Sequence, residues 1–205
     1  MADGERYELP PERLGRWLER WADEHGGVVD TVASARTVSY TAADGAVVEC
    51  EPPFPPVEGE LLAHVARERA VGVLLVRLGG HAAGVFRGTR LVDSKVGTRE
   101  VHGRHRAGGS SSGRFARRRA GQARVALRAA ADVAVRVLAA PAAAGELDAV
   151  VLGGDRSALA TVLEDVRLVR VRALAVERVL DVGDPRLRVL QATPDAFRAT
   201  VVRVR

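Results

Sequence analysis

The sequence is poor in cysteine, lysine and aromatic residues. Its 205 residues include one cysteine, Cys50, so an internal disulfide bond is excluded and the chain fits a reducing compartment. Aromatic residues make up only 4% of the chain, so its core must be built mainly from valine, leucine and alanine. Lys95 is the one lysine among 31 basic residues. Such a skew can reflect genome base composition, so the use of arginine in place of lysine is no evidence of function by itself.

Long apolar runs are absent as well. No stretch approaches the roughly 20 apolar residues that a membrane-spanning helix needs. The first residues, MADGERYELPPE, are acidic and polar, and they lack the basic start and apolar segment of a signal peptide. We therefore expect a cytoplasmic protein with no membrane partner.

The basic charge is concentrated in one segment. The chain carries a net charge of +5 and has a pI near 10.4, which favours a polyanionic partner. Between residues 99 and 128, nine arginines stand against one acidic residue, Glu100. These arginines are Arg99, Arg104, Arg106, Arg114, Arg117, Arg118, Arg119, Arg124 and Arg128. The clustering, more than the total charge, indicates that this segment meets phosphate groups.

The first 56 residues predict a small helix and hairpin unit. Two prolines, Pro10 and Pro11, open a helix with apolar residues at helical spacing, and Gly26 and Gly27 end it. We interpret Trp17 and Trp21 in this helix as core residues. Residues 37–40 and 47–50 read as two strands joined by a turn. The proline-rich residues 52–56 then predict a boundary between units 1–56 and 57–205.

The rest of the chain predicts a mixed β-sheet flanked by helices, an α/β fold with α+β as the alternative. A helix is expected over residues 58–69, followed by strands at 71–78, 82–86 and 90–96 in an antiparallel meander with the first strand central. A long helix covers 114–140, and a short strand at 148–152 leads through Gly153 and Gly154 to a helix with Asp155 as its N-cap. The remainder predicts one more strand or helix, and a final strand. With 47% hydrophobic residues, we expect one main domain and a small appended unit.

The long helix divides into two faces. At 100° per residue, Arg114, Arg117, Arg118, Arg124 and Arg128 fall on one side. Phe115, Ala123, Ala126, Ala130, Val133 and Val137 fall on the other. Gln122 lies at the border, one turn after Arg118. The helix therefore has a basic face and a packing face.

The segment before this helix, residues 108–112, is small and flexible, and common catalytic motifs do not explain it. The G-x-S-x-G pattern at residues 109–113 fails as a nucleophile elbow because all five histidines precede the serines. It fails as a P-loop because Arg114 and Phe115 replace the lysine and hydroxyl residue. His102 and His105 with one distant cysteine do not make a zinc site, so no metal is expected. Gly153 and Gly154 can cradle a phosphate, although a tight structural turn is favoured.

At this loop and helix the sequence resembles the Vms-like release factors, in particular their actinobacterial-type branch. The resemblance lies in SKVGTREVHGRHRAGG (residues 94–109), RFARRR (114–119) and Gln122, with LLVRLGGHAAGVFRG upstream and VVLGGDRSAL downstream. It extends from about residue 58 to the C-terminus. The family's catalytic domain is similar to the central domain of eukaryotic and archaeal class I release factors.

The resemblance implies a peptidyl-tRNA hydrolase that rescues stalled ribosomes in translation quality control. Its glycine-rich loop would enter the peptidyl transferase centre of the large subunit and cleave the ester between nascent peptide and tRNA, with water as nucleophile and no cofactor. The partners it implies are large-subunit rRNA and peptidyl-tRNA. A glutamine that orients the attacking water in the family has no counterpart here, because Ser111 or Ser112 stands at the corresponding position.

These considerations define the candidate site. The catalytic candidates are Gly108, Gly109, Ser110, Ser111, Ser112 and Gln122. The RNA-binding candidates are Arg104, Arg106, Arg114, Arg117, Arg118, Arg119 and Arg124. Three explanations of the missing glutamine stay open: a serine positions the water, the backbone supplies most of the stabilisation, or Gln122 is recruited by unwinding of the helix start. The alternative functions are a ribosome- or RNA-binding module without catalysis, and a structural domain whose arginines are merely solvated.

Overall fold

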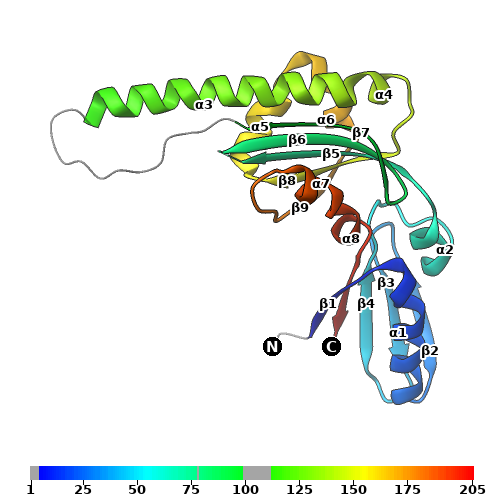
Figure 1. Ribbon diagram of the computed structural model, residues 1–205. Helices are drawn as coiled ribbons and strands as arrows, with labels where there is room; N and C mark the ends of the chain where they lie inside the picture. Colours follow the sequence, from blue (N-terminus) through cyan, green and yellow to red (C-terminus); the bar gives the residue numbers. More distant parts are fainter. Residues whose placement is uncertain (1–4, 78, 99–111) are drawn as a thin grey trace. The chain divides into compact units, whose positions relative to one another are not determined.

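The computed structural model describes residues 5–77, 79–98 and 112–205, with the side chains of Thr98 and residues 112–120 outside the description (Figure 1). The chain divides into two units. The first comprises Met1–Glu68 and Pro194–Arg205, and the second comprises Arg69–Thr193. Each unit has its own five-stranded sheet and its own hydrophobic core. The predicted combination of sheets and helices is confirmed.

In the first unit, helix α1 (Pro11–Glu24) packs on an antiparallel sheet. Pro11 stands at the start of the helix, where its missing N–H breaks no helical hydrogen bond. Leu14 and Trp21 are buried against the sheet, and Trp17 lies half-buried beside them. Gly26, with a φ of +82°, follows the helix, as the sequence predicted. The tryptophans therefore belong to the core.

The sheet of the first unit has the strand order β1-β10-β4-β3-β2. Its strands are β1 (Arg6–Leu9), β2 (Val28–Ala33), β3 (Val38–Ala42), β4 (Val47–Glu51) and β10 (Thr200–Val204). The predicted hairpin is confirmed as β3 and β4, whereas β1 and β2 were not predicted. Helix α2 (Leu61–Ala66) is shorter than predicted, because Gly59 has a φ of +70° and Glu60 is extended.

The final strand, β10, lies between β1 and β4. Val202 pairs with Tyr7 on one side and Cys50 on the other, and its side chain is fully buried. The predicted final strand is therefore present, but it completes the sheet of the N-terminal unit. That unit differs from the expected 1–56 because it extends to Glu68 and includes residues 194–205. The second unit is inserted between its two parts.

Removing the last six residues, from Thr200 onward, is expected to unfold the first unit. The deletion exposes the paired edges of β1 and β4 and removes Val202 from the core. Both tryptophans of the chain lie in α1, so their fluorescence reports on this unit alone. We expect emission shifted to the wavelength of the denatured protein. An Arg205→Ala control should keep native emission, and native emission in the deletion variant would contradict the prediction.

The second unit contains a mixed sheet with the strand order β7-β6-β5-β8-β9. Its strands are β5 (Ala70–Arg77), β6 (Gly80–Arg87), β7 (Arg90–Thr98), β8 (Ala149–Gly154) and β9 (Ala175–Leu180). Strands β5, β6 and β7 form the predicted antiparallel meander, and β8 runs parallel to β5. The apolar β5 occupies the predicted central position, which explains why its residues are buried on both faces.

Helices cover both faces of this sheet (Figure 1). They are α3 (Ser112–Ala134), a π-helical segment (Val135–Ala139), α4 (Ala140–Ala143), α5 (Arg156–Leu163), a 3₁₀ turn (Val166–Leu168), α6 (Val169–Ala173) and α7 (Leu187–Gln191). A further short helix, α8 (Thr193–Phe197), begins at the last residue of the second unit and otherwise belongs to the first. Figure 1 shows α3, α5 and α6 on one face and α7 on the other. The predicted long helix is confirmed, with Pro141 near the start of α4 and Gly145 beyond its end.

Gly153 and Gly154 are the last two residues of β8, so the strand is longer than predicted and no separate turn precedes the cap at Asp155. Gly154 has a φ of +103°, and a Cβ atom there would lie 2.2 Å from the carbonyl oxygen of Val76 on β5. The Asp155 carboxylate accepts hydrogen bonds from the N–H groups of Ser157 and Ala158 at 2.9 and 3.0 Å, as a helix N-cap does. The glycines thus serve the close packing of β8 against β5.

Candidate nucleic-acid interface

Helix α3 is held to the sheet by small apolar residues along one face. Ala130 and Ala134 are buried in the core of the second unit, and Val137 and Leu138 in the π-helical segment are buried with them. Ala123, Ala126 and Val133 are half-buried. The predicted packing face is therefore confirmed for its described members, while the side chain of Phe115 lies outside the description. Alanine at these positions lets the helix backbone lie close to the strands.

The first turns of α3 lie beyond the strand ends (Figure 1). Among the described side chains of α3, those from residue 121 onward, core contacts begin at about Leu127 and continue to the C-terminal end of the helix. The helix is 23 residues long, so its N-terminal part extends past the sheet that supports the remainder.

The supported part of α3 is also held by an ion-pair network. The Arg167 guanidinium donates to Asp132 of α3 at 2.7 Å and to Asp165 at 2.6 Å. Hydrogen bonds from Arg167 lower the pKa of Asp165 to about 2, and the positive charge of Arg128 contributes to this lowering. The network links α3 to the 3₁₀ turn over residues 166–168. It was not predicted, because residues 35 apart in the sequence meet only after folding.

Replacing Arg167 by methionine is expected to return the pKa of Asp165 towards its ordinary value of 3.8. Because Arg167 favours the ionised carboxylate, its stabilising effect is present above pH about 4 and is lost as the pH falls towards 2. An NMR titration of the Asp165 carboxyl group measures the change directly. An Arg170→Met control should leave the titration unchanged, and an unaltered Asp165 titration in Arg167→Met would refute the assignment.

The described arginines of α3 are exposed to solvent. Arg124 and Arg128 are exposed, and no ion pair within the described part of the chain involves either of them. Arg114, Arg117, Arg118 and Arg119 lie on the first turns of α3, where the description covers the backbone alone. Arg104 and Arg106 lie outside the described residues.

The catalytic candidates fall mostly outside the described residues. Gly108, Gly109, Ser110 and Ser111 belong to the segment between β7 and α3 that is not described, and Ser112 is the first residue of α3. Gln122 lies between the two ends of this helix, and its side chain is exposed to solvent. At 1.5 Å per residue it stands roughly 15 Å along the axis from Ser112. Recruitment of Gln122 to the loop therefore requires unwinding of several helical turns, and its catalytic role stays a prediction.

Strand β7, which precedes the glycine–serine segment, packs closely against β6 near its C-terminal end. Gly97 of β7 pairs with His81 of β6, and a Cβ atom on Gly97 would lie 2.2 Å from the His81 Nε2 atom. The buried His81 ring thus covers Gly97, one residue before the end of β7. The sequence singled out neither residue, because a histidine in an apolar strand gives no signal of the glycine opposite it.

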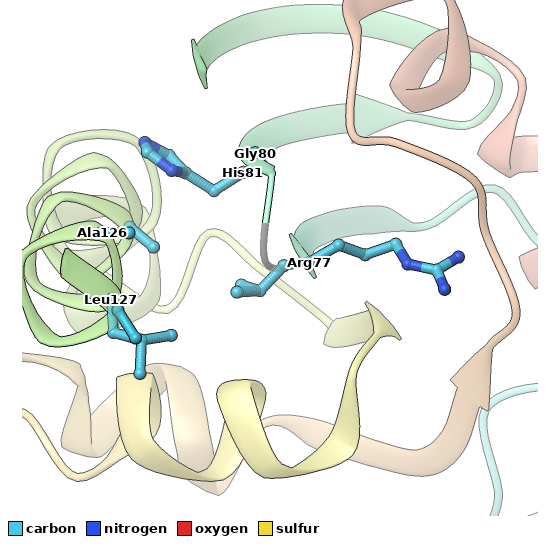
Figure 2. A pocket seen from close by; sticks show the side chains of 8 residues that line it. Arg77, Gly80, His81, Ala126 and Leu127 are labelled. Carbon is cyan, nitrogen blue, oxygen red and sulfur yellow. The ribbon is translucent and has the colours of Figure 1, made fainter. Parts of the chain in front are cut away.

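A small, mostly apolar pocket lies between this end of the sheet and α3 (Figure 2). Its lining residues are Val76, Arg77, Gly80, His81, Ala123, Ala126, Leu127 and Ala130. The Arg77 side chain points away from α3, and its guanidinium donates to the carbonyl oxygen of Val182 at 2.5 Å. Since the Arg77 guanidinium is turned away, it does not face the pocket, and the exposed arginines of α3 remain the candidates for phosphate contacts.

The two units carry opposite charge. The second unit holds 22 arginine and lysine residues against 11 acidic residues, a net charge of +11. The first unit holds 9 arginines against 15 acidic residues, a net charge of −6. A polyanion is therefore attracted to the second unit and repelled by the first. The modest charge of the whole chain conceals this difference.

Other kinds of site find little support. Burial raises the pKa of the Cys50 thiol to about 12, which leaves it without nucleophilic character near neutral pH. In the portions of the chain that the structure describes, no group of three histidine, cysteine or acidic side chains is arranged to hold a metal ion. Likewise, none of the described helices is long and apolar enough to cross a bilayer.

Comparison with known proteins identifies a family and two similar structures. Residues 69–203 match a family described as the actinobacteria/chloroflexi VLRF1 release factor. The archaeal translation termination factor aRF1 has a similar structure, with 15% sequence identity, a TM-score of 0.47, and coverage of 90% of this chain and 61% of its own. A structure titled only as an archaeal protein gives 18% identity and a TM-score of 0.44, over 78% of this chain and 52% of that one. The chain thus spans less than two thirds of either structure. No curated protein sequence matches it.

Proposed function

The chain belongs to the actinobacteria/chloroflexi VLRF1 release factor family, and from this we propose that it is a cytoplasmic peptidyl-tRNA hydrolase acting on stalled large ribosomal subunits. It would cleave the ester that joins the nascent peptide to tRNA and so release the peptide. The matched residues cover the whole second unit and residues 194–203 of the first. They include the glycine–serine segment, residues 108–112, and helix α3.

The observation that carries this proposal is the arrangement of buried and exposed residues along α3. The helix is buried along one face in its C-terminal part, exposes Arg124 and Arg128, and begins directly after the glycine–serine segment. A backbone with little side-chain bulk can approach a reacting ester closely. The arginines would contact phosphates of rRNA or of the tRNA acceptor end, which positions the loop without reading sequence.

The proposed chemistry is hydrolysis by water. Water attacks the ester carbonyl carbon and loses a proton, and the carbonyl oxygen gains negative charge in a tetrahedral intermediate. Backbone N–H groups of Gly109 and its neighbours would donate to this oxygen. The carbon–oxygen bond to the ribose then breaks, the ribose oxygen takes up a proton, and the peptide leaves with a free carboxyl group. No cofactor is needed in this scheme.

The second candidate is a ribosome-binding module without catalysis. The observation that favours it is the absence of a loop glutamine, because Ser111 or Ser112 stands where the resemblance implies one. A hydroxyl group has one donor and a shorter reach than an amide, so it controls a water molecule less precisely. Under this reading the arginines would still bind RNA, but no peptide would be released.

The experiment uses purified protein and large subunits that carry labelled peptidyl-tRNA. Gel electrophoresis separates free peptide from peptidyl-tRNA, and co-sedimentation measures binding to the subunits. Release together with binding supports the hydrolase, and puromycin confirms that the substrate is reactive. Binding without release at protein excess identifies the module. Absence of both contradicts either proposal.

A further inference from the structure

Strand β2 (Val28–Ala33) forms one outer edge of the sheet in the first unit. It pairs with β3 on one side, and in the described sheet no strand lies on its other side (Figure 1). All six of its residues are exposed. The Thr31 N–H donates to the Asp30 carboxylate at 2.9 Å, and the other outer backbone N–H and C=O groups of the strand are available to pair with another extended segment.

Apolar side chains on this strand are unusually exposed. Val28, Val29 and Val32 have exposed fractions of 45%, 65% and 60%. Natural sheets commonly protect an edge with charged side chains, and the opposite edge strand, β1, follows this pattern: Arg6 and Glu8 form an ion pair at 2.7 Å. Strand β2 has one charged residue, Asp30, and its register shifts between Val28 and Asp30. The regular part of its edge thus runs from Asp30 to Ala33.

Acidic residues lie in the segments that adjoin the start of β2. Asp23 and Glu24 are exposed at the end of α1, and Asp30 lies on the strand itself. The β3–β4 turn adds Asp44, because the Ala43 N–H donates to the Gly27 carbonyl oxygen at 3.0 Å. The Asp44 carboxylate accepts hydrogen bonds from the Ala46 N–H and the His25 ring, which lowers its pKa and keeps it ionised. His25 is the one basic side chain of the α1–β2 connection.

We propose that the outer edge of β2 is a docking site for an extended basic segment of another protein. The segment would add a strand to the sheet, cover the exposed valines with apolar side chains, and place lysine or arginine near the four carboxylates. Its positive charge complements a unit with a net charge of −6. The same charge disfavours RNA on this unit, and it disfavours a second copy, because pairing β2 with itself brings like charges together.

The test uses a synthetic ten-residue peptide of alternating valine and lysine, with a matched peptide in which glutamate replaces each lysine. Either peptide is titrated into the ¹⁵N-labelled full chain. The expected result is that the lysine peptide shifts amide signals of β2 and β3 and the glutamate peptide does not. The proposal is overturned by equal binding of both peptides, by shifts at β1 instead, or by no binding at millimolar peptide.

Two variants of the full chain sharpen the test. Val32→Lys puts a positive charge on the edge of β2, where it repels the lysines of the peptide, and it removes the apolar contact that Val32 would make. The variant should therefore bind the lysine peptide about tenfold more weakly. Ala63→Lys makes the same change of charge on an exposed position of α2 and should stay within about twofold. Equal affinities of the two variants would show a nonspecific charge effect and reject the site. A dimer that forms through β2 without peptide would identify a second copy as the occupant and also reject it.

Discussion

Replacing Gly109 by proline is expected to reduce peptide release from stalled large subunits by about 100-fold or more, while binding stays within about twofold. Proline removes a backbone N–H and fixes φ near −65°, and it also restricts the preceding residue, Gly108. Loss of one donor to a developing oxyanion typically costs about 100- to 1000-fold in rate. Single-turnover release of labelled peptide, with co-sedimentation at the same protein concentration, measures both quantities.

A matched control separates the contribution of the backbone to the release rate from that of the side chains. Ser110→Ala keeps the backbone N–H and removes only a hydroxyl group, so it should release peptide at nearly the normal rate if the backbone N–H groups stabilise the oxyanion. If Gly109→Pro also released peptide at the normal rate, the loop would not lie at the reacting ester. Loss of binding in that variant would instead assign Gly109 to the ribosome contact.

Side-chain variants distinguish the three explanations of the missing glutamine. A slow Ser111→Ala or Ser112→Ala variant would indicate that a hydroxyl group positions the water. A slow Gln122→Ala variant would indicate that the amide reaches the loop, which requires α3 to unwind from Ser112 towards Gln122. Normal release in all three, together with the loss in Gly109→Pro, would leave the backbone as the main source of stabilisation.

Reversing the charge of Arg117 and Arg118 together should weaken binding to large subunits by about 10- to 100-fold at low salt. Each phosphate contact contributes a slope of about −0.7 to −0.9 to the dependence of log affinity on log salt concentration, so losing two contacts should flatten the dependence by about 2. Co-sedimentation at several potassium concentrations measures both the affinity and the slope.

The first unit supplies the control for this experiment. Arg13→Glu with Arg16→Glu makes the same change in net charge on two exposed positions of α1, in the unit whose net charge is −6. If only the reversal on α3 weakens binding, position on the helix decides the effect. If both double variants weaken binding equally, net charge alone is responsible, and α3 loses its assigned role. An unchanged affinity in the α3 variant would reject both RNA-dependent proposals.

Much of the fold was predictable because its signals are local. The spacing of Leu14, Trp17 and Trp21 predicted α1, and the glycines around the meander predicted its turns. Asp155 predicted a helix start because its side chain caps backbone groups only two and three residues away. Each of these features depends on residues close in sequence, so a pattern of a few positions contains the needed information.

Strand partners and ion pairs were not predictable in the same way. Val202 pairs with Tyr7 and Cys50, which lie 195 and 152 positions earlier in the chain. The sequence of β10 does not indicate which of the two sheets it joins, because its apolar pattern would fit an open edge of either sheet. Arg167 meets Asp132, and His81 covers Gly97, for the same reason: the contact exists only once distant segments are placed side by side.

By itself, the sequence determined the periodic elements, the apolar core composition, and the run of arginines that begins beside a glycine–serine segment. These are properties of composition and spacing. The tertiary structure alone decided that the last strand belongs to the first unit, that the chain separates into an acidic and a basic part, and that α3 is fixed near its C-terminal end. Those properties arise from contacts through space, whose free energy depends on which distant residues fold against one another.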